Sequence, residues 1–387
     1  MRKKTKSFAG NLKKSAGYFF LIASLAIFCL RIQAEENRTP PATPGTQTPT
    51  KETSTEQEKR AKTLASLKET IQFANATERR QAIRKVVDLK AEERGEFIPL
   101  LNACSTEDPD STIREVCVRT LGDINVAESE SFLIKALADS SPDVVRSAIS
   151  ALAKLNSAAA MPELQKLLEK EDLKSQTSLA APIIRAMGKV GYRESAVFLF
   201  TKLKDSQTNL EVKSYIVLYM GQIKYIEAVD YLIELVKNEE EEIFLRSNAA
   251  NSLGKIGEKK AIDPLKEQLA KIRSLGLRER SAVNRLKIQI LGALVRLGDT
   301  RVSADIMAAA RDDDANVRLR AVNQLAELKV AEARPLLDFL SRRDPSTQVK
   351  RAAKKAIDVL DGKSDSTEEE ETPAAPNGRE SPRTPGR

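Results

Sequence analysis

A short apolar segment recurs along most of this sequence, and the repetition constrains the fold more than any other feature. Its copies include TIREVCVRTLGDI from residue 112, DVVRSAISALAKL from 143 and NVRLRAVNQLAEL from 316, with RQAIRKVVDL from 80 as a worn first copy. One large apolar residue, the landmark, occupies the same place in each copy, and successive landmarks are 31 to 41 residues apart. Such a period is typical of a solenoid built from one repeated supersecondary unit. The landmarks are Val86, Leu121, Leu152, Met187, Met220, Leu253, Leu294, Leu325 and Ile357.

Each copy follows a second apolar segment, for example EFIPLLNAC, AVDYLIELV or ARPLLDFL. Both segments carry apolar residues at the i, i+3, i+4 and i+7 spacing of an amphipathic helix. The turns between them hold helix-start residues such as Asp110, Ser141 and Asp314. Since one helix pair cannot bury its own apolar face, the pairs must stack on one another. The sequence therefore predicts an all-α fold, a right-handed α-solenoid of the armadillo-like type with about nine helix pairs.

Glycines recur at fixed places near the ends of the predicted second helices. A glycine directly after the landmark removes a side chain at the same point of several copies, which predicts close approach of neighbouring helices. Gly257 and Gly298 come after the predicted helix ends and suit a left-handed C-terminal cap. The glycines that follow a landmark are Gly122, Gly188, Gly221 and Gly254.

Residues 1–34 have the three parts of a secretory signal peptide. Residues 1–14 are basic, an uninterrupted apolar run extends from Ala16 to Leu30, and Ile32-Gln33-Ala34 offers a cleavage site. This run is shorter than the roughly 20 residues that a spanning helix needs. We therefore expect an exported protein, periplasmic or secreted, without membrane insertion after cleavage. An uncleaved anchor and a lipoprotein attached at Cys29 are the alternatives.

Composition separates the ends of the chain from its middle. Residues 35–57 and 362–387 are rich in Pro, Thr and Glu, which predicts a disordered linker and a disordered tail around a solenoid at 58–361. The formal net charge of +8 comes from residues 1–34, where seven Lys and Arg face no acid. The remainder holds 56 Lys and Arg against 55 Asp and Glu. A nearly neutral folded part argues against nucleic acid as a partner.

Two cysteines, Cys104 and Cys117, lie in the predicted solenoid. Both align with core positions of later copies, which are occupied there by Leu340 and Ala321. Two interpretations stay open: a pair of small buried side chains, or a disulfide between neighbouring helices in an oxidising compartment. Two cysteines without any His do not make a zinc site.

The pattern Asp/Pro-x-Val-Arg-x-x-Ala-x-x-x-Leu-Gly-x-Ile, followed by Ala-x-x-x-Leu-x-x-x-Leu, resembles the HEAT repeat family over about residues 76–360. It is most similar to the short bacterial form, the phycobilin-lyase HEAT-like repeat. The resemblance implies a basic residue near the start of the second helix, paired with acids of the adjoining turn. We expect this series to be structural, although Val145 and Ala180 interrupt it. It comprises Arg114, Lys213, Arg246, Lys287, Arg318 and Lys350, with Asp110, Asp314 and Asp344 among the turn acids.

The 387 residues contain no His, which excludes Ser-His-Asp and Cys-His catalysis and any His-carboxylate metal site. Metal-dependent hydroxylases built on HEAT repeats use paired His-Glu motifs, which this sequence lacks. The carboxylate runs Glu239–Glu242 and Glu368–Glu371 lie in a predicted turn and in the tail, where no pocket separates their pKa values. We therefore expect no enzymatic activity, no cofactor and no metal.

The second helices of HEAT solenoids line the concave face, so residues two before and two after the landmark predict a binding groove. From the copy at 143 to the copy at 285 these positions hold five cations and no acid. We predict that an aromatic residue, a leucine and two amides project among the cations, in a groove for a protein or an acidic peptide. The alternative is a solvated face with Tyr215 packed between helices. The candidate residues are Lys154, Arg185, Lys189, Tyr215, Leu218, Asn248, Asn251, Lys255 and Arg296.

A second candidate surface is the insertion at 271–283, KIRSLGLRERSAV, which accounts for the 41-residue gap between landmarks. It carries Lys271, Arg273, Arg278 and Arg280 around a glycine. Long loops in compact arrays are often functional. The alternative is a longer, solvated helix end.

These features favour a non-catalytic protein-interaction scaffold. One alternative is a structural component of a cell-envelope complex, in which the edges and tails make the contacts. A lyase or chaperone for a cofactor-bearing protein is a third. Groove cations paired with acids of neighbouring repeats would favour the structural component, because such pairs hold the array together.

Overall fold

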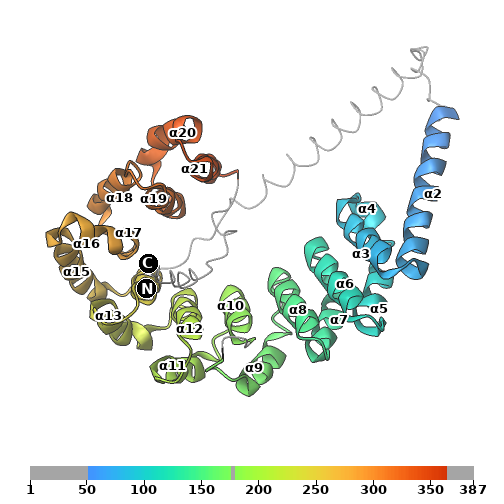
Figure 1. Ribbon diagram of the computed structural model, residues 1–387, viewed down its shortest axis with the longest axis horizontal. Coiled ribbons are helices and arrows are strands. Elements are labelled where there is room, and N and C mark those ends of the chain that lie inside the picture. Colours follow the sequence, from blue (N-terminus) through green and yellow to red (C-terminus); the bar gives the residue numbers. More distant parts are fainter. Residues whose placement is uncertain (1–50, 176–178, 364–387) are drawn as a thin grey trace, which may run out of the picture. The chain divides into compact units, whose positions relative to one another are not determined.

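The computed structural model describes residues 51–175 and 179–363, and every regular element within them is an α-helix or a short 3₁₀-helix (Figure 1). The chain divides into two compact units, residues 1–67 and 68–387. The described part of the first unit is the beginning of helix α2 (Lys51–Phe73), which starts inside the range assigned to a linker. The predicted signal peptide, most of that linker and the tail from 364 lie outside the described residues. No described helix is both long and apolar enough to cross a membrane.

The second unit is built of helix pairs, as the repeat predicts. The second helices contact one another in sequence, from α3 to α21, so the pairs form an α-solenoid. These second helices are α3 (Ala76–Lys85, continued by η1, Val86–Asp88), α6 (Ser111–Ile124), α8 (Pro142–Lys154), α10 (Ala180–Val190), α12 (Leu210–Gln222), α14 (Ile243–Ile256), α17 (Asn284–Arg296), α19 (Ala315–Glu327) and α21 (Thr347–Leu360). The first helices are α5 (Ile98–Glu107), α7 (Glu130–Lys135), α9 (Met161–Lys170), α11 (Ala196–Lys204), α13 (Val229–Lys237), α15 (Ile262–Ser274), α18 (Ser303–Ala309) and α20 (Arg334–Arg343), with short helices α4 (Ala91–Arg94) and α16 (Leu277–Ala282) beside them.

The landmark residues form the core between stacked pairs. Eight of them, from Val86 to Leu325, are at most 1% exposed. Ile357 is half-buried, and it lies on α21, the last helix in the described part of the chain. Burying a side chain of this size contributes about 1.5–3 kcal/mol. The alignment of copies therefore identified the core correctly.

The glycines after the landmarks let the second helices pack closely, as predicted. A Cβ added at Gly254 would lie 2.6 Å from Cα of Ala293 on the next second helix. A Cβ at Gly122 would lie 2.6 Å from Cβ of Ala151. Gly257 and Gly298 have φ of +89° and +107°, the left-handed conformation expected of C-terminal caps.

Acids in the turns cap the second helices. Asp110 precedes α6 and accepts a hydrogen bond from the backbone N–H of Thr112, and Asp314 precedes α19 and accepts one from Asn316. The expectation that these two acids pair with the basic series is therefore wrong. Their carboxylates instead accept hydrogen bonds from free backbone N–H groups at the start of their own helices.

Two members of the basic series, Arg114 and Arg318, pair with an acid in the turn of the following repeat. Arg114 donates from Nε and Nη2 to Asp139, at 2.6 and 2.7 Å. Arg79, which holds the same place in the first copy and was not recognised in the sequence, contacts Asp108. Arg246 instead donates to the carbonyl of Val236 at 3.0 Å. Each bidentate pair links two repeats, so Arg114 and Arg318 have the structural role expected of the series. For Lys213, Lys287 and Lys350 this role stays a prediction.

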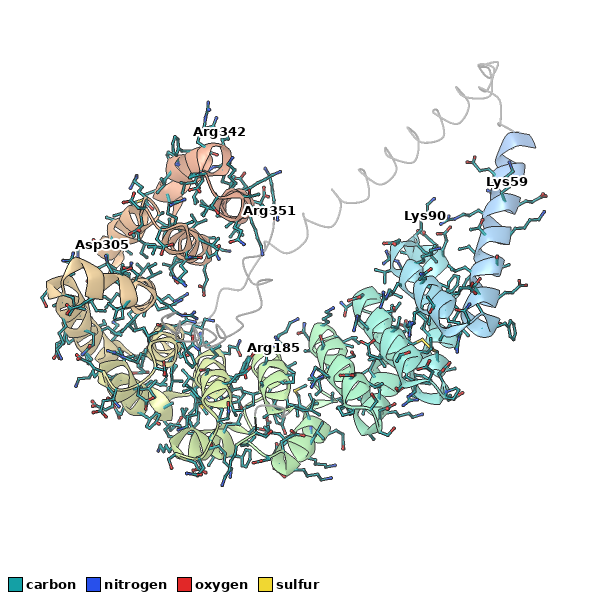
Figure 2. The ribbon with its side chains drawn as sticks, in the orientation of Figure 1. Lys59, Lys90, Arg185, Asp305, Arg342 and Arg351 are labelled. Atoms are coloured by element: carbon teal, nitrogen blue, oxygen red, sulfur yellow. A yellow bond between two sulfur atoms is a disulfide. The ribbon has the colours of Figure 1, made fainter. Side chains whose placement is uncertain are left out.

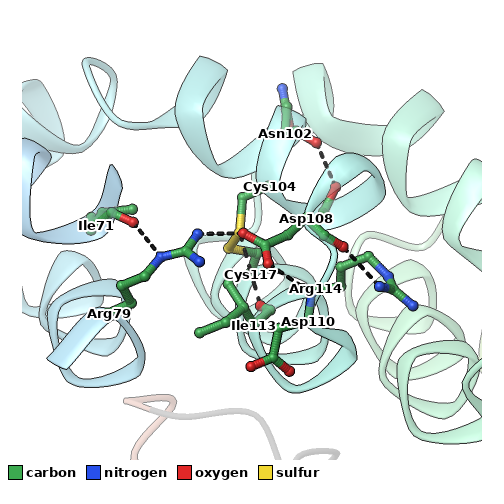
Figure 3. The surroundings of a disulfide bond; sticks show 10 residues. Ile71, Arg79, Asn102, Cys104, Asp108, Asp110, Ile113, Arg114 and Cys117 are labelled. Carbon is green, nitrogen blue, oxygen red and sulfur yellow. Dashed lines mark hydrogen bonds and ion pairs between the residues drawn. A yellow bond between two sulfur atoms is a disulfide. The ribbon is translucent and has the colours of Figure 1, made fainter. Parts of the chain in front are cut away.

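Cys104 on α5 and Cys117 on α6 form a disulfide, with their Cα atoms 6.1 Å apart (Figure 3). It joins the two helices of one pair, and Arg79 and Arg114 lie beside it (Figure 3). Of the two interpretations that the sequence left open, the structure has the disulfide. Such bonds are typical of oxidising compartments.

Candidate functional site

The candidate groove residues lie on consecutive second helices, as the spacing predicts. Each of α8, α10, α12, α14 and α17 contributes at least one of them, and each of these helices contacts the next. Lys154 and Lys189 are exposed, whereas Arg185, Lys255 and Arg296 are half-buried. Arg185 is labelled on α10 in Figure 2.

Four of the nine candidates do not project into solvent. Tyr215 is 9% exposed and Leu218 is 6% exposed, and Asn248 and Asn251 are also buried. The expectation of an exposed aromatic residue is wrong because α12 is packed against α10, α11 and α14. Helices enclosed on several sides bury residues that a single-helix projection places outside. The Tyr215 side chain therefore packs between the helices and does not project into solvent.

Two groove cations are held by acids of neighbouring repeats. The Lys154 ammonium lies 2.6 Å from a carboxylate oxygen of Asp123 on α6. The Arg296 guanidinium lies 2.5 Å from Glu327 on α19 and donates to Asn251 Oδ1 at 3.2 Å. Both acids lie two residues after their own landmark, in the copies that flank those from 143 to 285. These pairs connect second helices and reduce the positive charge that a ligand would meet.

A hollow of about 420 Å³ lies between the first halves of α8, α10 and α12. Arg185 and Tyr215 both line it, so the structure brings two of the predicted residues to one site. Ser147 and Ser150 of α8 line the same hollow. The full lining is Arg146, Ser147, Ser150, Ser175, Ala181, Pro182, Arg185, Asn209, Glu211, Val212 and Tyr215.

Three lining residues, one from each second helix, share a position in the repeat, and two of them were not predicted. Ser147, Pro182 and Tyr215 each lie five residues before a landmark. The small Ser147 and Pro182 leave space beside the ring of Tyr215, which explains why the hollow forms here. Side-chain size at this position, compared between copies, indicates the site. The positions two residues from the landmark do not include Ser147 or Pro182.

Hydrogen bonds order the floor of the hollow. Ser147 donates to Glu115 of α6 at 3.0 Å, and Glu115 also contacts Arg119. The Arg146 guanidinium lies 2.9 Å from Asp143. A smaller hollow of about 180 Å³ between α6 and α8 shares Ser147 and Ser150 with the first. The lining of the hollow thus offers hydroxyl and guanidinium donors, an aromatic wall and one carboxylate, Glu211, a mixture suited to recognising polar ligands.

The insertion at 271–283 forms helical structure with local contacts. Helix α15 extends to Ser274 and is followed by the short helix α16. Arg273 lies 2.6 Å from Asp305, and Arg280 donates to the carbonyl of Leu275. Lys271 lies 3.3 Å from Glu267. The helical structure agrees with the longer helix end, and the insertion as a second binding surface stays a prediction.

Within residues 51–175 and 179–363, no group of three or more acidic or cysteine side chains is arranged to hold a metal ion. The stacked helix pairs place the chain in the class of α-solenoid repeat proteins. The family model of HEAT repeats matches residues 98–181 and 198–284. Residues 98–181 and 198–284 therefore consist of HEAT repeats, as the sequence pattern indicated.

Several solved structures are similar. The phycocyanin lyase complex of CpcE and CpcF from Nostoc sp. PCC7120 has a TM-score of 0.39 and 17% identity, covering 84% of this chain and 98% of its own. Importin beta has a TM-score of 0.44 and 14% identity, covering 77% of this chain and 46% of its own. Human deoxyhypusine hydroxylase has a TM-score of 0.30 and 16% identity, and the match covers 69% of this chain and 96% of the hydroxylase chain. A comparison with curated proteins finds no match.

Proposed function

We propose that the chain is an exported, non-catalytic scaffold that binds an acidic segment of a partner protein on the surface formed by α8, α10 and α12. The observation that carries this proposal is the hollow of about 420 Å³, because it combines Arg185, Tyr215 and two serine hydroxyls on neighbouring second helices. The Arg185 guanidinium and the Ser150 hydroxyl donate to a carboxylate, while Ser147 already donates to Glu115, and the tyrosine ring supplies apolar contact area to the segment.

The absence of enzymatic activity remains part of the proposal. The sequence contains no His, and the lining of the hollow contains one carboxylate, Glu211. Acid-base catalysis with two carboxylates requires a second one held in a contrasting environment. A binding role makes no such demand on the lining.

The test is direct binding of a labelled peptide rich in Glu to the purified chain, followed by fluorescence polarisation. Arg185→Gln should weaken binding about tenfold, a loss of about 1.4 kcal/mol, because one charge-assisted hydrogen bond is removed. Binding should also weaken as salt is raised. The matched control is Lys166→Gln, which removes an exposed cation from the first helix α9. Equal losses for both variants, or no loss for either, would refute the proposed surface.

Export is proposed from residues 1–34. N-terminal sequencing of protein from the periplasm or culture medium should give a chain that begins at or near Glu35. Recovery of Met1 on soluble cytoplasmic protein would contradict export without affecting the binding proposal.

A second candidate is a structural component of an envelope complex. It is favoured by the pairs Lys154–Asp123 and Arg296–Glu327, which use groove cations to join repeats. In that case the chain should sediment with a large envelope assembly, and Arg185→Gln should sediment in the same way. Loss of a partner on Arg185→Gln alone would favour the scaffold.

A further inference from the structure

Buried polar atoms without a hydrogen-bond partner gather on α14, α17 and α19. Five of the ten such side-chain atoms in the described residues lie on these helices. One of them, Arg296 Nη2, is 2.5 Å from Glu327, and the other four are Asn248 Nδ2, Arg285 Nε, Gln289 Oε1 and Gln324 Nε2. Asn248 is 6% exposed and Gln324 is 3% exposed. An unpaired buried polar group costs about 1–3 kcal/mol. A cluster of them points to a ligand that supplies the missing partners.

Arg285 on α17 and Arg320 on α19 are close enough to repel each other. Burial and the charge of Arg320 both lower the pKa of Arg285. Within the described residues neither guanidinium is in an ion pair, whereas Arg296, three turns further along α17, contacts Glu327. Two like charges held together without an acid form a site for an anion.

Gln324 connects the two helices. Its Nε2 lies 2.3 Å from the point where a Cβ of Gly292 would be, so the amide occupies space that any other residue at 292 would fill. Gly292 lies one turn after Gln289 on α17. Gln289, Gln324 and the two arginines therefore lie along the contact between α17 and α19, and Asn248 lies on α14, which packs against α17. A peptide matches these groups, since its carboxylates and carbonyls accept hydrogen bonds while its N–H groups donate to an oxygen such as Gln289 Oε1.

We infer that this arginine-amide cluster binds the acidic run Glu368–Glu371 of the chain's own tail. The cluster comprises Asn248, Arg285, Gln289, Arg320 and Gln324. The run lies outside the described residues, and with Asp365 it is the densest acidic segment that follows the solenoid. Its carboxylates neutralise Arg285 and Arg320, and charge-assisted hydrogen bonds to guanidinium groups are the strongest that a carboxylate makes.

The tail is long enough to reach the cluster. The path runs back along α21 for about 15 Å and across to the space between α17 and α19 for about 15 Å, or about 20 Å directly. Fully extended, residues 364–369 reach about 20 Å and residues 364–371 about 27 Å, so the carboxylates of Glu369, Glu370 and Glu371 reach the cluster. A tethered segment at this distance has an effective concentration in the millimolar range, so even a weak contact is populated. The inference does not depend on the hollow at Arg185.

The test uses a labelled peptide of residues 364–374, SDSTEEEETPA, and the full chain. Wild type should bind the peptide weakly, because its own tail occupies the cluster. The variant with Glu368, Glu369, Glu370 and Glu371 all changed to Gln should bind it about tenfold more tightly, since competition is removed. Equal binding by these two proteins, or binding by neither, would overturn the inference.

Adding Arg285→Gln and Arg320→Gln to the tail variant should abolish this gain. The matched control adds Arg342→Gln and Arg343→Gln, two exposed arginines on α20. If the control loses binding equally, net charge and not the cluster attracts the peptide, and the inference fails. Circular dichroism checks that each variant is folded, and Arg320→Gln alone provides the arm with the smallest change to the buried surface. Arg185→Gln should leave the tenfold gain on changing the tail intact, because that gain measures competition at the cluster alone, and this separates the cluster from the proposed partner site.

Discussion

Arg318 on α19 and Asp344 in the next turn form a two-point ion pair, with Nε to Oδ2 at 2.8 Å and Nη2 to Oδ1 at 2.9 Å. Both side chains are buried. The remaining guanidinium nitrogen Nη1 donates to the carbonyls of Asp312 and Asp313. The pair is thus fully hydrogen-bonded and joins two consecutive repeats. Its role is structural, in contrast to the exposed cations on the second helices, for which binding is proposed.

Arg318→Ala should lower the free energy of unfolding by about 3–5 kcal/mol, because it leaves the Asp344 carboxylate buried without its counter-charge. Urea denaturation measures the loss. The matched control is Arg301→Ala, since Arg301 makes the same two contacts with Asp299, at 2.9 and 3.1 Å, but is 84% exposed. Little change is expected there because solvent screens the pair. Similar losses for both variants would contradict the structural role of burial.

Acid should destabilise the array through the same pairs. Hydrogen bonds from Arg114 and Arg318 hold the pKa of Asp139 and of Asp344 below the usual range. The unfolded chain therefore binds more protons, and the free energy of unfolding should fall as the pH drops below about 4. The double change Asp139→Asn and Asp344→Asn should lower stability at pH 7 and flatten this decline. An unchanged slope in the variant would show that other carboxylates cause the acid sensitivity.

The sequence predicted the fold well because the core repeats. Aligning nine copies located buried residues such as Leu253 and Leu325, and the glycine after the landmark predicted close packing at Gly254. The partner of Arg114 was not predictable in this way. Its Asp139 lies in the next repeat, and periodicity alone does not say whether a side chain bonds within its own turn or across the junction.

The candidate site was predicted less completely. A projection from one helix placed Tyr215 in solvent, but three neighbouring helices contact α12 and bury it. The hollow beside it depends on the sizes of Ser147 and Pro182, on two other helices. The sequence pattern did not predict Arg285 and Arg320 as site residues, because neither lies two residues from a landmark. Surfaces formed by several repeats depend on relative helix positions, which a pattern along one helix does not contain.

Gly254→Ala should destabilise the protein by about 1–3 kcal/mol, because the new methyl group meets the backbone of Ala293. Helix propensity alone favours Ala over Gly by about 1 kcal/mol, so the sign of the effect tests the packing. Gly95→Ala is the control, since the nearest atom to its Cβ would be 3.7 Å away. Thermal unfolding should show a lower midpoint for Gly254→Ala than for wild type, and Gly95→Ala should not lower the midpoint. A stabilised Gly254→Ala variant would contradict the close approach of α14 and α17.

Reduction of the Cys104–Cys117 bond should cost about 3 kcal/mol of stability, given the sequence separation of 13 residues. Urea denaturation with and without dithiothreitol gives the difference. The variant Cys104→Ala, Cys117→Ala should show no further effect of the reductant. Alkylation of both thiols in unreduced, unfolded protein would contradict the disulfide, and mass spectrometry distinguishes the two states.

Lys154 and Lys189 hold the same repeat position, two residues after the landmark, but in different surroundings. Lys154 is paired with Asp123 at 2.6 Å, whereas Lys189 is exposed and, in the described residues, forms no ion pair. Lys189→Glu should therefore leave thermal stability within about 1 kcal/mol of wild type while weakening the binding of a Glu-rich peptide in low salt. Lys154→Glu should lower stability slightly more, because it brings a second carboxylate close to Asp123. If Lys189→Glu binds the peptide as well as wild type at low salt, the second helices do not guide an acidic partner, and the paired cations reflect assembly of the array alone.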